Sequence, residues 1–544
     1  MNKDQLPEFD YIVIGSGFGG SVSAMRLSEK GYKVLVIEKG KRWTAKDFPE
    51  SNWNLKKYIW APALRLFGFL KLNFFKEVFV LSGVGVGGGS LVYANTHMMP
   101  KEPFYKHPGW SDLKDWKNVL QPYFEKAKFM LGSSKYTKEH AEDLALKAVA
   151  SDIGKAETYS RVDYVGVYLG PVDKPTDPFF NGLGPQRKGC TECAGCMVGC
   201  RHDAKNTLDK NYLWFAEKYF GAQIQAETEV DRITYDDSTK YYTVEAQSGL
   251  GWFKTRKKFS ARGIVVSGGV LGTLNLLLRQ KYVYKTLPRL SDRLGENLMT
   301  NSEMLSGVMA ADRRLNYGIA ISSIIDVDEN THVELCKFPD GSGSMFRLAT
   351  RAAGAGAPPV RILKMFGNII LSPVKFLRTL FSFNPARNAV ILLIMQTLHS
   401  AMRMNIRRGL FGWKLKIQNS GKVPSYIPAG QDILYRYAQK VNGVPMNAAT
   451  EIFFGLSSTA HILGGCPPGA SSGQAVVDAD FKAFGYDNFY ILDGSIVPCN
   501  LGVNPSLTIT ALSEYAMAQV PVCPGTNNLT LEQLMSEKRS GAEA

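Results

Sequence analysis

Apolar and polar residues near the N-terminus follow the order expected for a strand, a helix and a second strand. A strand-like segment at residues 10–14, apolar after Asp10, precedes a glycine-rich turn and helical spacing from Val22 to Lys30. A second such segment follows at 33–37, apolar after Lys33. This order is typical of a parallel βαβ unit. We therefore expect an α/β protein whose parallel sheet begins close to the N-terminus.

A second transition from strand to helix is predicted near the C-terminus. Residues 488–492 form an apolar strand that ends at Asp493 and is followed by Gly494. Asn504 is a suitable helix N-cap, and Pro505 suits the first helical position. A helix that begins there would direct its positive end at a ligand beyond the sheet. Either such a ligand or an ordinary capped core helix explains the pattern.

Residues 360–381 combine an apolar stripe with basic side chains. The stripe resumes after Pro373, and its first part consists of Ile362, Met365, Phe366, Ile369 and Ile370. A basic amphipathic helix of this kind suits the surface of an anionic membrane. Packing of the stripe against a protein core explains it equally well. Both alternatives also apply to residues 55–75, where a second helix with bulky apolar and basic residues is expected.

The positive charge of the chain is confined to two stretches. The 544 residues carry 64 Lys and Arg against 49 Asp and Glu, and 45% are hydrophobic, which excludes disorder and collagen-like repeats. Residues 51–76 and 341–431 contain eighteen basic residues and no acidic residue. Because no nucleic-acid-binding motif accompanies this charge, nucleic acid is not an expected partner.

The sequence also indicates where the protein resides. It shows no N-terminal apolar segment typical of a secretory signal and no uncharged run of about 18 residues typical of a membrane span. Eight cysteines are too few for a disulfide scaffold. We expect a cytoplasmic protein, either free or peripheral on the inner face of the membrane.

The turn after the first strand has the spacing of a dinucleotide-binding loop. Gly15 permits a tight turn, Gly17 lets the backbone approach a pyrophosphate, and Gly20 lets the helix pack on the strand. Glu38, at the end of the second strand, is placed to accept hydrogen bonds from ribose hydroxyls. A glycine string within residues 83–95 could make a second contact. These features predict a cofactor that contains ADP, either FAD or NAD.

Four cysteines lie close together in one segment. Cys190, Cys193, Cys196 and Cys200 have the C-x2-C-x2-C-x3-C spacing of ferredoxin ligands, although Arg201 follows where ferredoxins have proline. Three interpretations remain open. They are one iron–sulfur cluster held by three or four thiolates, a tetrahedral zinc ion, and two disulfides or free thiols.

Five blocks of sequence together resemble the glucose-methanol-choline (GMC) family of flavin oxidoreductases, specifically its bacterial cholesterol-oxidase branch. They are GSGFGG (15–20) with Glu38, GVGVGGGSLVYAN (83–95), VVSGGVLGTLNLLL (265–278), HILGGC (461–466) and DGSIVPCNLGVNPSLTITAL (493–512). The resemblance implies FAD, a discontinuous Rossmann-like FAD-binding domain, and an inserted α+β substrate domain built on a β-sheet. The implied limits are 1–95, 204–300 and 455–525 for FAD, 96–203 (cap and cysteine cluster) and 301–454 for substrate, and 526–544 for a polar tail.

The resemblance also implies roles for individual residues. His461 and Asn504 would face the flavin and the substrate hydroxyl, and Glu334 would match the acid that steroid-oxidising members use for isomerisation. Asp493 would lie near the flavin ribityl and pyrophosphate, and the backbone of Val230 would meet the adenine. The other cofactor-binding positions implied are Gly15, Gly17, Gly20, Glu38, Gly87, Gly88, Ser90, Asn95, Gly494 and Pro505.

The chemistry of these side chains is compatible with such roles. Alcohol oxidation removes the hydroxyl proton and transfers a hydride from the same carbon to flavin N5. An imidazole titrates near neutral pH, so His461 could accept the proton. Asn504 could only donate and accept hydrogen bonds. Glu334 could move a proton between carbons of a 5-ene-3-one steroid, or could be an ordinary surface carboxylate.

These inferences favour FAD-dependent oxidation of a secondary alcohol on a bulky apolar substrate, such as the 3β-hydroxysteroid cholesterol, with or without double-bond isomerisation. Two alternatives remain open. One is a dehydrogenase with FAD and an iron–sulfur cluster that passes electrons to a partner protein instead of oxygen. The other is a flavin-containing membrane-surface protein without turnover. The expected partners are a sterol or lipid alcohol, oxygen or an electron acceptor protein, and an anionic membrane surface.

Overall fold

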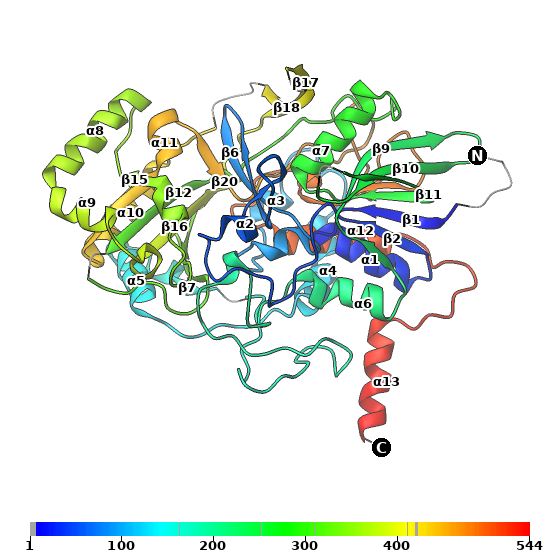
Figure 1. Cartoon of the computed structure of the whole chain (residues 1–544), viewed down its shortest axis with the longest axis horizontal. Coiled ribbons are helices and arrows are strands. Elements are labelled where there is room, and N and C mark those ends of the chain that lie inside the picture. The colour runs from blue at the N-terminus through cyan, green and yellow to red at the C-terminus, as the bar shows by residue number, and fades with distance from the viewer. Residues whose placement is uncertain are drawn as a thin grey trace.

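The computed structural model describes residues 7–162, 164–251, 253–310, 312–410, 412–418 and 423–543. The first six residues of the N-terminus and Lys422 of the basic stretch, which entered the predictions above, lie outside these ranges. Two large sheets form the body of the protein, one mainly parallel and one antiparallel (Figure 1).

The first sheet is mainly parallel and comes from three separated parts of the chain. Its strands are β1 (Phe9–Ile14), β2 (Val34–Ile37), β8 (Gln223–Gln225), β9 (Thr228–Asp236), β10 (Tyr241–Ser248), β11 (Thr255–Val266) and β21 (Phe489–Ile491). They lie in the order β8-β2-β1-β11-β10-β9, with β21 beside β11. The pairs β2–β8, β1–β2, β1–β11 and β11–β21 are parallel, whereas β10 is antiparallel to both β9 and β11.

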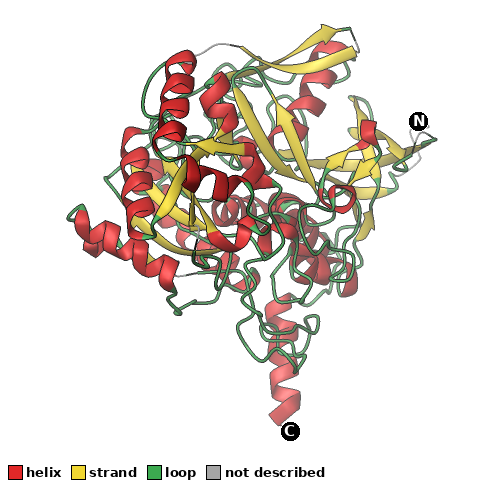
Figure 2. Ribbon diagram, turned by 60° about the vertical axis from the view of Figure 1, so that its left-hand side comes forward, coloured by secondary structure: helices red, strands yellow, loops and turns green. Residues whose placement is uncertain are grey.

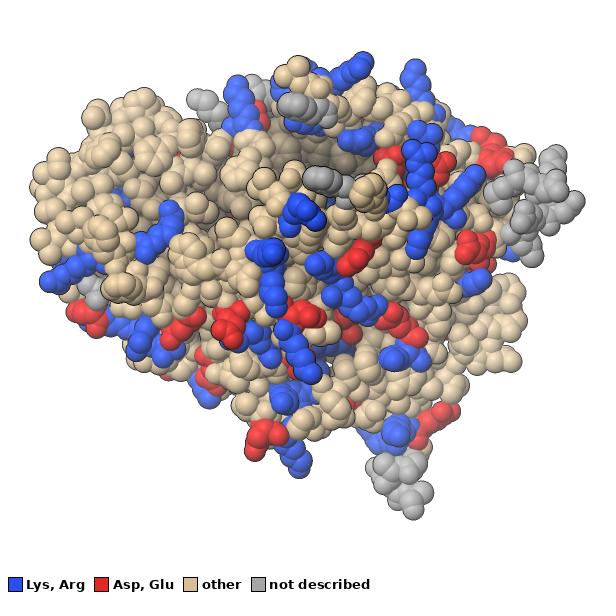
Figure 3. Space-filling model, in the orientation of Figure 1, with Lys and Arg blue, Asp and Glu red and all other residues tan. Residues whose placement is uncertain are grey.

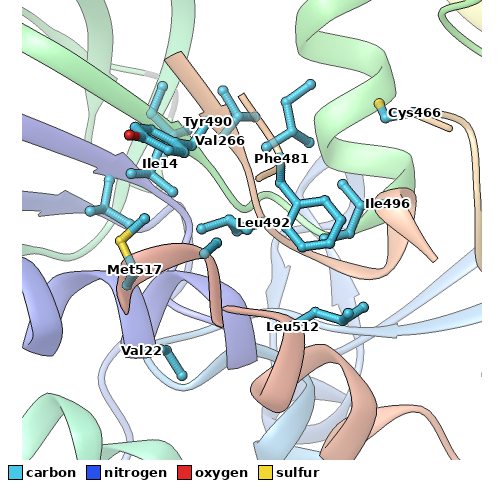
Figure 4. Close-up of a cluster of buried hydrophobic side chains, with 14 of the residues drawn as sticks. Ile14, Val22, Val266, Cys466, Phe481, Tyr490, Leu492, Ile496, Leu512 and Met517 are labelled. Atoms are coloured by element: carbon cyan, nitrogen blue, oxygen red, sulfur yellow. The ribbon is translucent and has the colours of Figure 1, made fainter. Parts of the chain in front are cut away.

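Helices α1 (Phe18–Glu29) and α12 (Ser506–Ala518) pack against each other and form a core with this sheet. All four residues of β2 are buried, as expected for a parallel strand that is covered on both faces. A buried ion pair of 2.8 Å between Arg26 and Glu514 joins the two helices. Figure 4 shows part of the apolar core, including Ile14, Val22, Val266, Leu492, Leu512 and Met517.

The second sheet is antiparallel throughout. Its strands, in spatial order, are β15 (Ala349–Arg351), β19 (Gly443–Ala448), β12 (Met304–Ala310), β16 (Ala389–Gln396), β14 (Thr331–Cys336), β13 (Ile321–Asp326) and β7 (Ser160–Arg161). Helices α5 (Ala141–Asp152) and α10 (Pro428–Lys440) pack on it. Every residue of β14 is buried, so polar side chains on this strand face other protein groups or a ligand.

Shorter elements complete the fold (Figure 2). A small sheet contains β5 (Leu70–Phe74), β6 (Val78–Gly83) and β20 (Ser457–Thr459), and two hairpins contain β3 (Trp60–Ala61) with β4 (Leu66–Phe67) and β17 (Arg403–Gly409) with β18 (Gly412–Gln418). The other helices are α2 (Leu55–Tyr58), α3 (Glu102–Tyr105), α4 (Trp116–Met130), α6 (Tyr212–Lys218), α7 (Val270–Leu278), α8 (Pro358–Leu371), α9 (Pro373–Leu380), α11 (Ala449–Phe454) and α13 (Leu531–Glu543).

The predicted fold class is confirmed, and so are the helices expected in residues 360–381, which form α8 and α9. The prediction of a second helix in residues 55–75 is wrong, except for the four residues of α2. Residues 70–74 alternate apolar and polar side chains, the period of a strand, and pair with β6 as β5. The predicted polar tail contains α13. None of the helices in the described ranges has the length and hydropathy needed to cross a bilayer.

Candidate active site

The turn between β1 and α1 leaves clear space in front of the helix. A Cβ atom on Gly15 would lie 2.2 Å from the carbonyl oxygen of Ser267, and one on Gly20 would lie 2.0 Å from that of Gly15. Both positions therefore need glycine for backbone packing. A Cβ on Gly17 would meet no described protein atom within 4 Å. Because helix N-termini stabilise phosphate groups, this open space suits a pyrophosphate.

Glu38 is buried at the end of β2 and holds the same turn in place. Its carboxylate accepts hydrogen bonds from the amide and hydroxyl of Ser16, at 3.1 and 2.8 Å, and from the amide of Gly40 at 2.9 Å. The carbonyl of Glu38 accepts a 2.9 Å bond from the amide of Thr228. The structure therefore places the beginning of β9, which carries Val230, beside Glu38.

The glycine string packs against this turn. A Cβ on Gly88 would lie 2.6 Å from the Cα of Gly17, and Gly87 has a φ of 103°. The hydroxyl of Ser90 donates to the carbonyl of Gly87 at 2.7 Å and accepts from the amide of Leu208 at 3.1 Å. Gly87 and Gly88 therefore shape the loop beside the phosphate space, and Ser90 fixes it.

Two buried polar residues extend the site along the sheet. Both side-chain amide atoms of Asn95 lack a hydrogen-bond partner among the described residues, which is costly unless a ligand supplies one. Burial raises the pKa of Asp493, although its carboxylate accepts from the hydroxyl of Thr273 at 2.5 Å and the amide of Ser495 at 2.8 Å. Gly494 follows directly, and its carbonyl accepts a 2.9 Å bond from the amide of Gly464.

The three predicted catalytic residues meet at one buried point. The amide Nδ2 of Asn504 donates to Oε2 of Glu334 at 3.3 Å and lies 3.4 Å from Nε2 of His461. Glu334 comes from β14, His461 follows β20, and Asn504 precedes α12. The Oδ1 atom of Asn504 has no described partner. Three distant segments thus form a polar cluster between the two sheets, with one acceptor left free.

The prediction that Asn504 caps the following helix is wrong. Helix α12 begins at Ser506, Pro505 occupies the N-cap position, and no side chain caps the helix. The amide of Asn504 is directed instead at Glu334 and His461. In this conformation Asn504 does not cap the helix. Its side chain contacts Glu334 and His461 instead.

Two residues of this cluster were not found from the sequence. Nδ1 of His461 lies 2.5 Å from Oε1 of Glu303, and Nε2 of His332 lies 3.2 Å from Oε1 of Glu334. Glu303 belongs to none of the recognised blocks, so no signal identified it. His332 lies two residues before Glu334, and the period of a strand places both on one face. That spacing could have identified His332.

Nearby carboxylates favour the charged forms of both histidines. Burial lowers the pKa of His461, but Glu303, with Glu334, outweighs burial and raises it. Burial likewise lowers the pKa of His332, and Asp326 and Glu334 together reverse this and raise it. Both imidazoles therefore keep their proton to higher pH than an isolated histidine does.

The cysteine cluster lies outside this polar group. Its four cysteines are free and line one small cavity, together with His202 and Lys205. Across the described residues, no three or more His, Cys, Asp or Glu side chains are arranged to hold a metal ion. The structure thus gathers the four sulfur atoms around one space without a disulfide and without a preformed site for a single metal ion.

A Rossmann-like domain beside a buried cluster of His, Asn and Glu side chains is an arrangement typical of dinucleotide-dependent oxidoreductases. Residues 183–300 and 427–513 match the GMC oxidoreductase family, and residues 13–47 match an NAD(P)-binding Rossmann-like domain. A cholesterol oxidase of Acinetobacter baumannii is 40% identical over 94% of each chain. One of Mycobacterium tuberculosis is 37% identical over 95% of this chain and 91% of its own. The chain belongs to the GMC oxidoreductase family.

A solved structure, pyridoxine 4-oxidase from Mesorbium loti, shares the fold. It has a TM-score of 0.60 at 17% identity and covers 94% of this chain and 98% of its own. Membership of the family makes the protein an FAD-dependent oxidoreductase that acts on CH–OH donors. The open phosphate space at Gly17 and the unpartnered amide of Asn95 fit a large polar cofactor of this kind.

Proposed function

We propose that the protein oxidises the 3β-hydroxyl group of a sterol such as cholesterol to a ketone. The meeting of His461, Asn504 and Glu334 at one buried point is the observation that carries this proposal. The similarity to cholesterol oxidases, at 40% and 37% identity, supports a sterol as the substrate.

Each polar residue of the cluster has a distinct role in this proposal. Donation of the Nδ1 proton of His461 to Glu303 leaves Nε2 as the acceptor of the hydroxyl proton. Glu303 orients the ring and stabilises its protonated form, as a carboxylate does in a catalytic triad. Asn504 positions the alcohol by hydrogen bonding, since an amide cannot act as a base. FAD supplies a hydride acceptor when bound.

We propose that FAD is held by the predicted cofactor residues, within the predicted domain limits. The turn at Gly15, Gly17 and Gly20 would bind the pyrophosphate, and Glu38 with the backbone of Val230 would bind the adenosine half. The remaining contacts would come from Gly87, Gly88, Ser90, Asn95, Asp493, Gly494, Asn504 and Pro505. Residues 96–203 and 301–454 would then enclose the substrate.

Glu334 is proposed to isomerise the steroid double bond after oxidation. It is completely buried and is hydrogen-bonded to Asn504, the residue that would position the substrate oxygen. A carboxylate at this point could remove a proton from C4 of a 5-ene-3-one and return one to C6. Such transfer between carbons is a general acid–base reaction.

A substrate panel tests the proposed activity. Purified holoenzyme should convert cholesterol to the 3-ketone far faster than it oxidises a primary long-chain alcohol. The His461→Gln variant should lose turnover on the order of 100-fold or more while retaining FAD, because it lacks the proton acceptor. A preference for primary alcohols, or a His461→Gln variant of normal activity, would contradict the proposal.

We also propose that the sterol is taken from an anionic bilayer on which α8 and α9 dock. Met365 is buried and holds α8 on the protein, so the predicted apolar stripe is partly core. Apolar side chains on the outer side remain exposed, including Leu363 (72%), Ile370 (76%), Leu371 (83%) and Phe381 (71%). Exposed basic residues Lys364, Lys375 and Arg378 accompany them. A surface of this size and composition suits an anionic membrane.

A second candidate function keeps the same site but passes electrons to a partner protein. The spacing of Cys190, Cys193, Cys196 and Cys200 and the one cavity that they line support it, because iron–sulfur clusters are held by neighbouring thiolates. Arg187 and Lys205 are buried, and Lys205 lines the same cavity as these cysteines. Lys205 donates to the carbonyls of Leu91 and Cys196, at 3.1 and 2.7 Å. An anionic cluster would balance both side chains.

Peroxide and iron measurements separate the two candidates. If oxygen is the acceptor, hydrogen peroxide should form in proportion to ketone, and protein purified without air should lack iron and acid-labile sulfide. If the protein is a dehydrogenase, it should contain iron and acid-labile sulfide and should form ketone only when an electron acceptor is added. The Cys196→Ser variant should then lose the cluster. Stoichiometric peroxide from iron-free protein would eliminate the second candidate.

A further inference from the structure

A chain of hydrogen bonds connects the buried Glu334 to the protein surface. Oε1 of Glu334 lies 3.2 Å from Nε2 of His332, and Nδ1 of His332 lies 2.7 Å from Oδ1 of Asp326. The side chains are 0%, 2% and 44% exposed, in that order. Two hydrogen bonds therefore lead from the centre of the proposed active site to a carboxylate in contact with water.

The strand register explains why these three residues are aligned. His332 and Glu334 lie two residues apart on β14, so their side chains are on the same face. Asp326 is the direct cross-strand partner of His332 at the end of β13. Lys101 donates to the same Oδ1 atom of Asp326 at 2.8 Å, which fixes the carboxylate and leaves its second oxygen for water. The alignment is thus built into the antiparallel sheet.

The other carboxylate of the site provides no comparable route. Glu303 is completely buried, and its two oxygens accept from His461 and from the amide of Ala460 at 2.8 Å. Asn504, between Glu334 and His461, cannot carry a proton because an amide does not titrate in water. A proton taken up by Glu334 therefore has its shortest described path to solvent through His332.

We infer that His332 and Asp326 form a proton relay that connects Glu334 with solvent. The inference rests on the proposed role of Glu334. When His332 is neutral and carries its proton on Nδ1, a proton on Glu334 passes to Nε2 while the Nδ1 proton passes to Asp326 and then to water, and the reverse sequence delivers a proton. During isomerisation the C4–H bond breaks, the double bond moves into conjugation, and a C6–H bond forms. The relay lets the hydrogen at C6 come from water.

Deuterium incorporation tests the relay. Holoenzyme in heavy water should convert cholest-5-en-3-one to the conjugated ketone with deuterium at C6, measured by mass spectrometry. His332→Gln retains hydrogen bonding but cannot relay a proton, so the deuterium content should fall several-fold while isomerisation continues. The Glu329→Gln variant removes an exposed acid from the same hairpin and should behave as the wild type. Equal deuterium in His332→Gln and wild type would overturn the relay.

A second measurement keeps the relay separate from the proposed activity. The chain has seven histidines, so nitrogen-15 labelling of histidine can resolve the ring protons of His332 by NMR. Asp326→Asn should slow exchange of these protons with water by at least ten-fold, whereas Glu329→Gln should not. Unchanged exchange in Asp326→Asn would overturn the relay. If the wild type does not isomerise the ketone, the proposed role of Glu334 is wrong. The exchange rate in Asp326→Asn still shows whether the relay exists.

Discussion

At the scale of single residues, the cluster pairs each histidine with carboxylates. His461 has Glu303 on one ring nitrogen and Asn504 near the other, and His332 lies between Glu334 and Asp326. A carboxylate on Nδ1 fixes the tautomer and leaves Nε2 to accept a proton. The sequence motif identified His461, but only the folded structure shows which group orients it.

The partner of His461 should determine the pH dependence of oxidation. Glu303 raises the pKa of His461, so activity that requires the neutral ring falls as the pH decreases through this raised value. Removing the charge in Glu303→Gln should shift the acidic limb of the kcat/KM profile to lower pH. The rate at high pH should also fall, because the ring is less well oriented. If the acidic limb of the Glu303→Gln profile stays at the wild-type pH, the limb reflects the titration of a group other than His461.

Substitution of Glu334 should slow isomerisation much more than oxidation. Glu334→Gln preserves a hydrogen-bonding side chain but removes the carboxylate, so isomerisation should fall on the order of 100-fold or more. Oxidation of the hydroxyl should change much less, because His461 accepts that proton. Chromatography of the products should then show accumulation of the unconjugated ketone. Conjugated ketone formed at the wild-type rate would assign isomerisation to another residue.

At the scale of secondary structure elements, the β1–α1 turn has glycines with different functions. Gly20 allows helix and strand to approach, whereas a Cβ on Gly17 would meet no described protein atom within 4 Å, which leaves the space proposed for the cofactor. Local pattern predicted this unit correctly, because spacing within one short segment determines it. The helix expected beyond residue 58 was wrong because pairing with β6, a non-local contact, outweighs helical spacing. Glu303 was not predicted because its role depends on contact with a residue far along the chain.

Two substitutions in this turn should have different effects. Gly17→Ala adds a methyl group that meets no described protein atom within 4 Å, so the apoprotein should unfold at the wild-type temperature but bind FAD weakly. Gly20→Ala places Cβ 2.0 Å from the carbonyl of Gly15 and should lower the unfolding temperature even without FAD. Calorimetry of both apoproteins and FAD titration measure this. Equal destabilisation of the two apoproteins would contradict it.

At the scale of the whole molecule, the parallel sheet and the surface proposed to contact a membrane belong to opposite ends. The parallel sheet lies at one end in Figure 1, and α8 and α9 lie at the other. In Figure 3 the end formed by α8 and α9 is largely uncharged on the visible face, with a few blue basic side chains. Helix α11 packs against α8 and leads to β20 and His461.

Membrane binding should depend on the outer side of α8. The double variant Leu363→Asp, Ile370→Asp should reduce sedimentation with vesicles that contain phosphatidylglycerol by about ten-fold or more, since each apolar side chain contributes about 1.5–3 kcal/mol on burial. Phe253→Asp, a change at a 97% exposed residue of the other end, is the control. High salt should weaken wild-type binding. Binding unaffected by the double variant would place the membrane contact elsewhere.

The central claim is that a sterol hydroxyl is oxidised at the cluster of His461, Asn504 and Glu334. Anaerobic mixing of the holoenzyme with cholesterol, followed by visible absorbance, tests it most directly. The flavin absorbance should bleach within a turnover in wild type and at least 100-fold more slowly in His461→Gln. Flavin that stays oxidised in wild-type protein with cholesterol and other 3β-hydroxysterols would contradict sterol oxidation at this cluster.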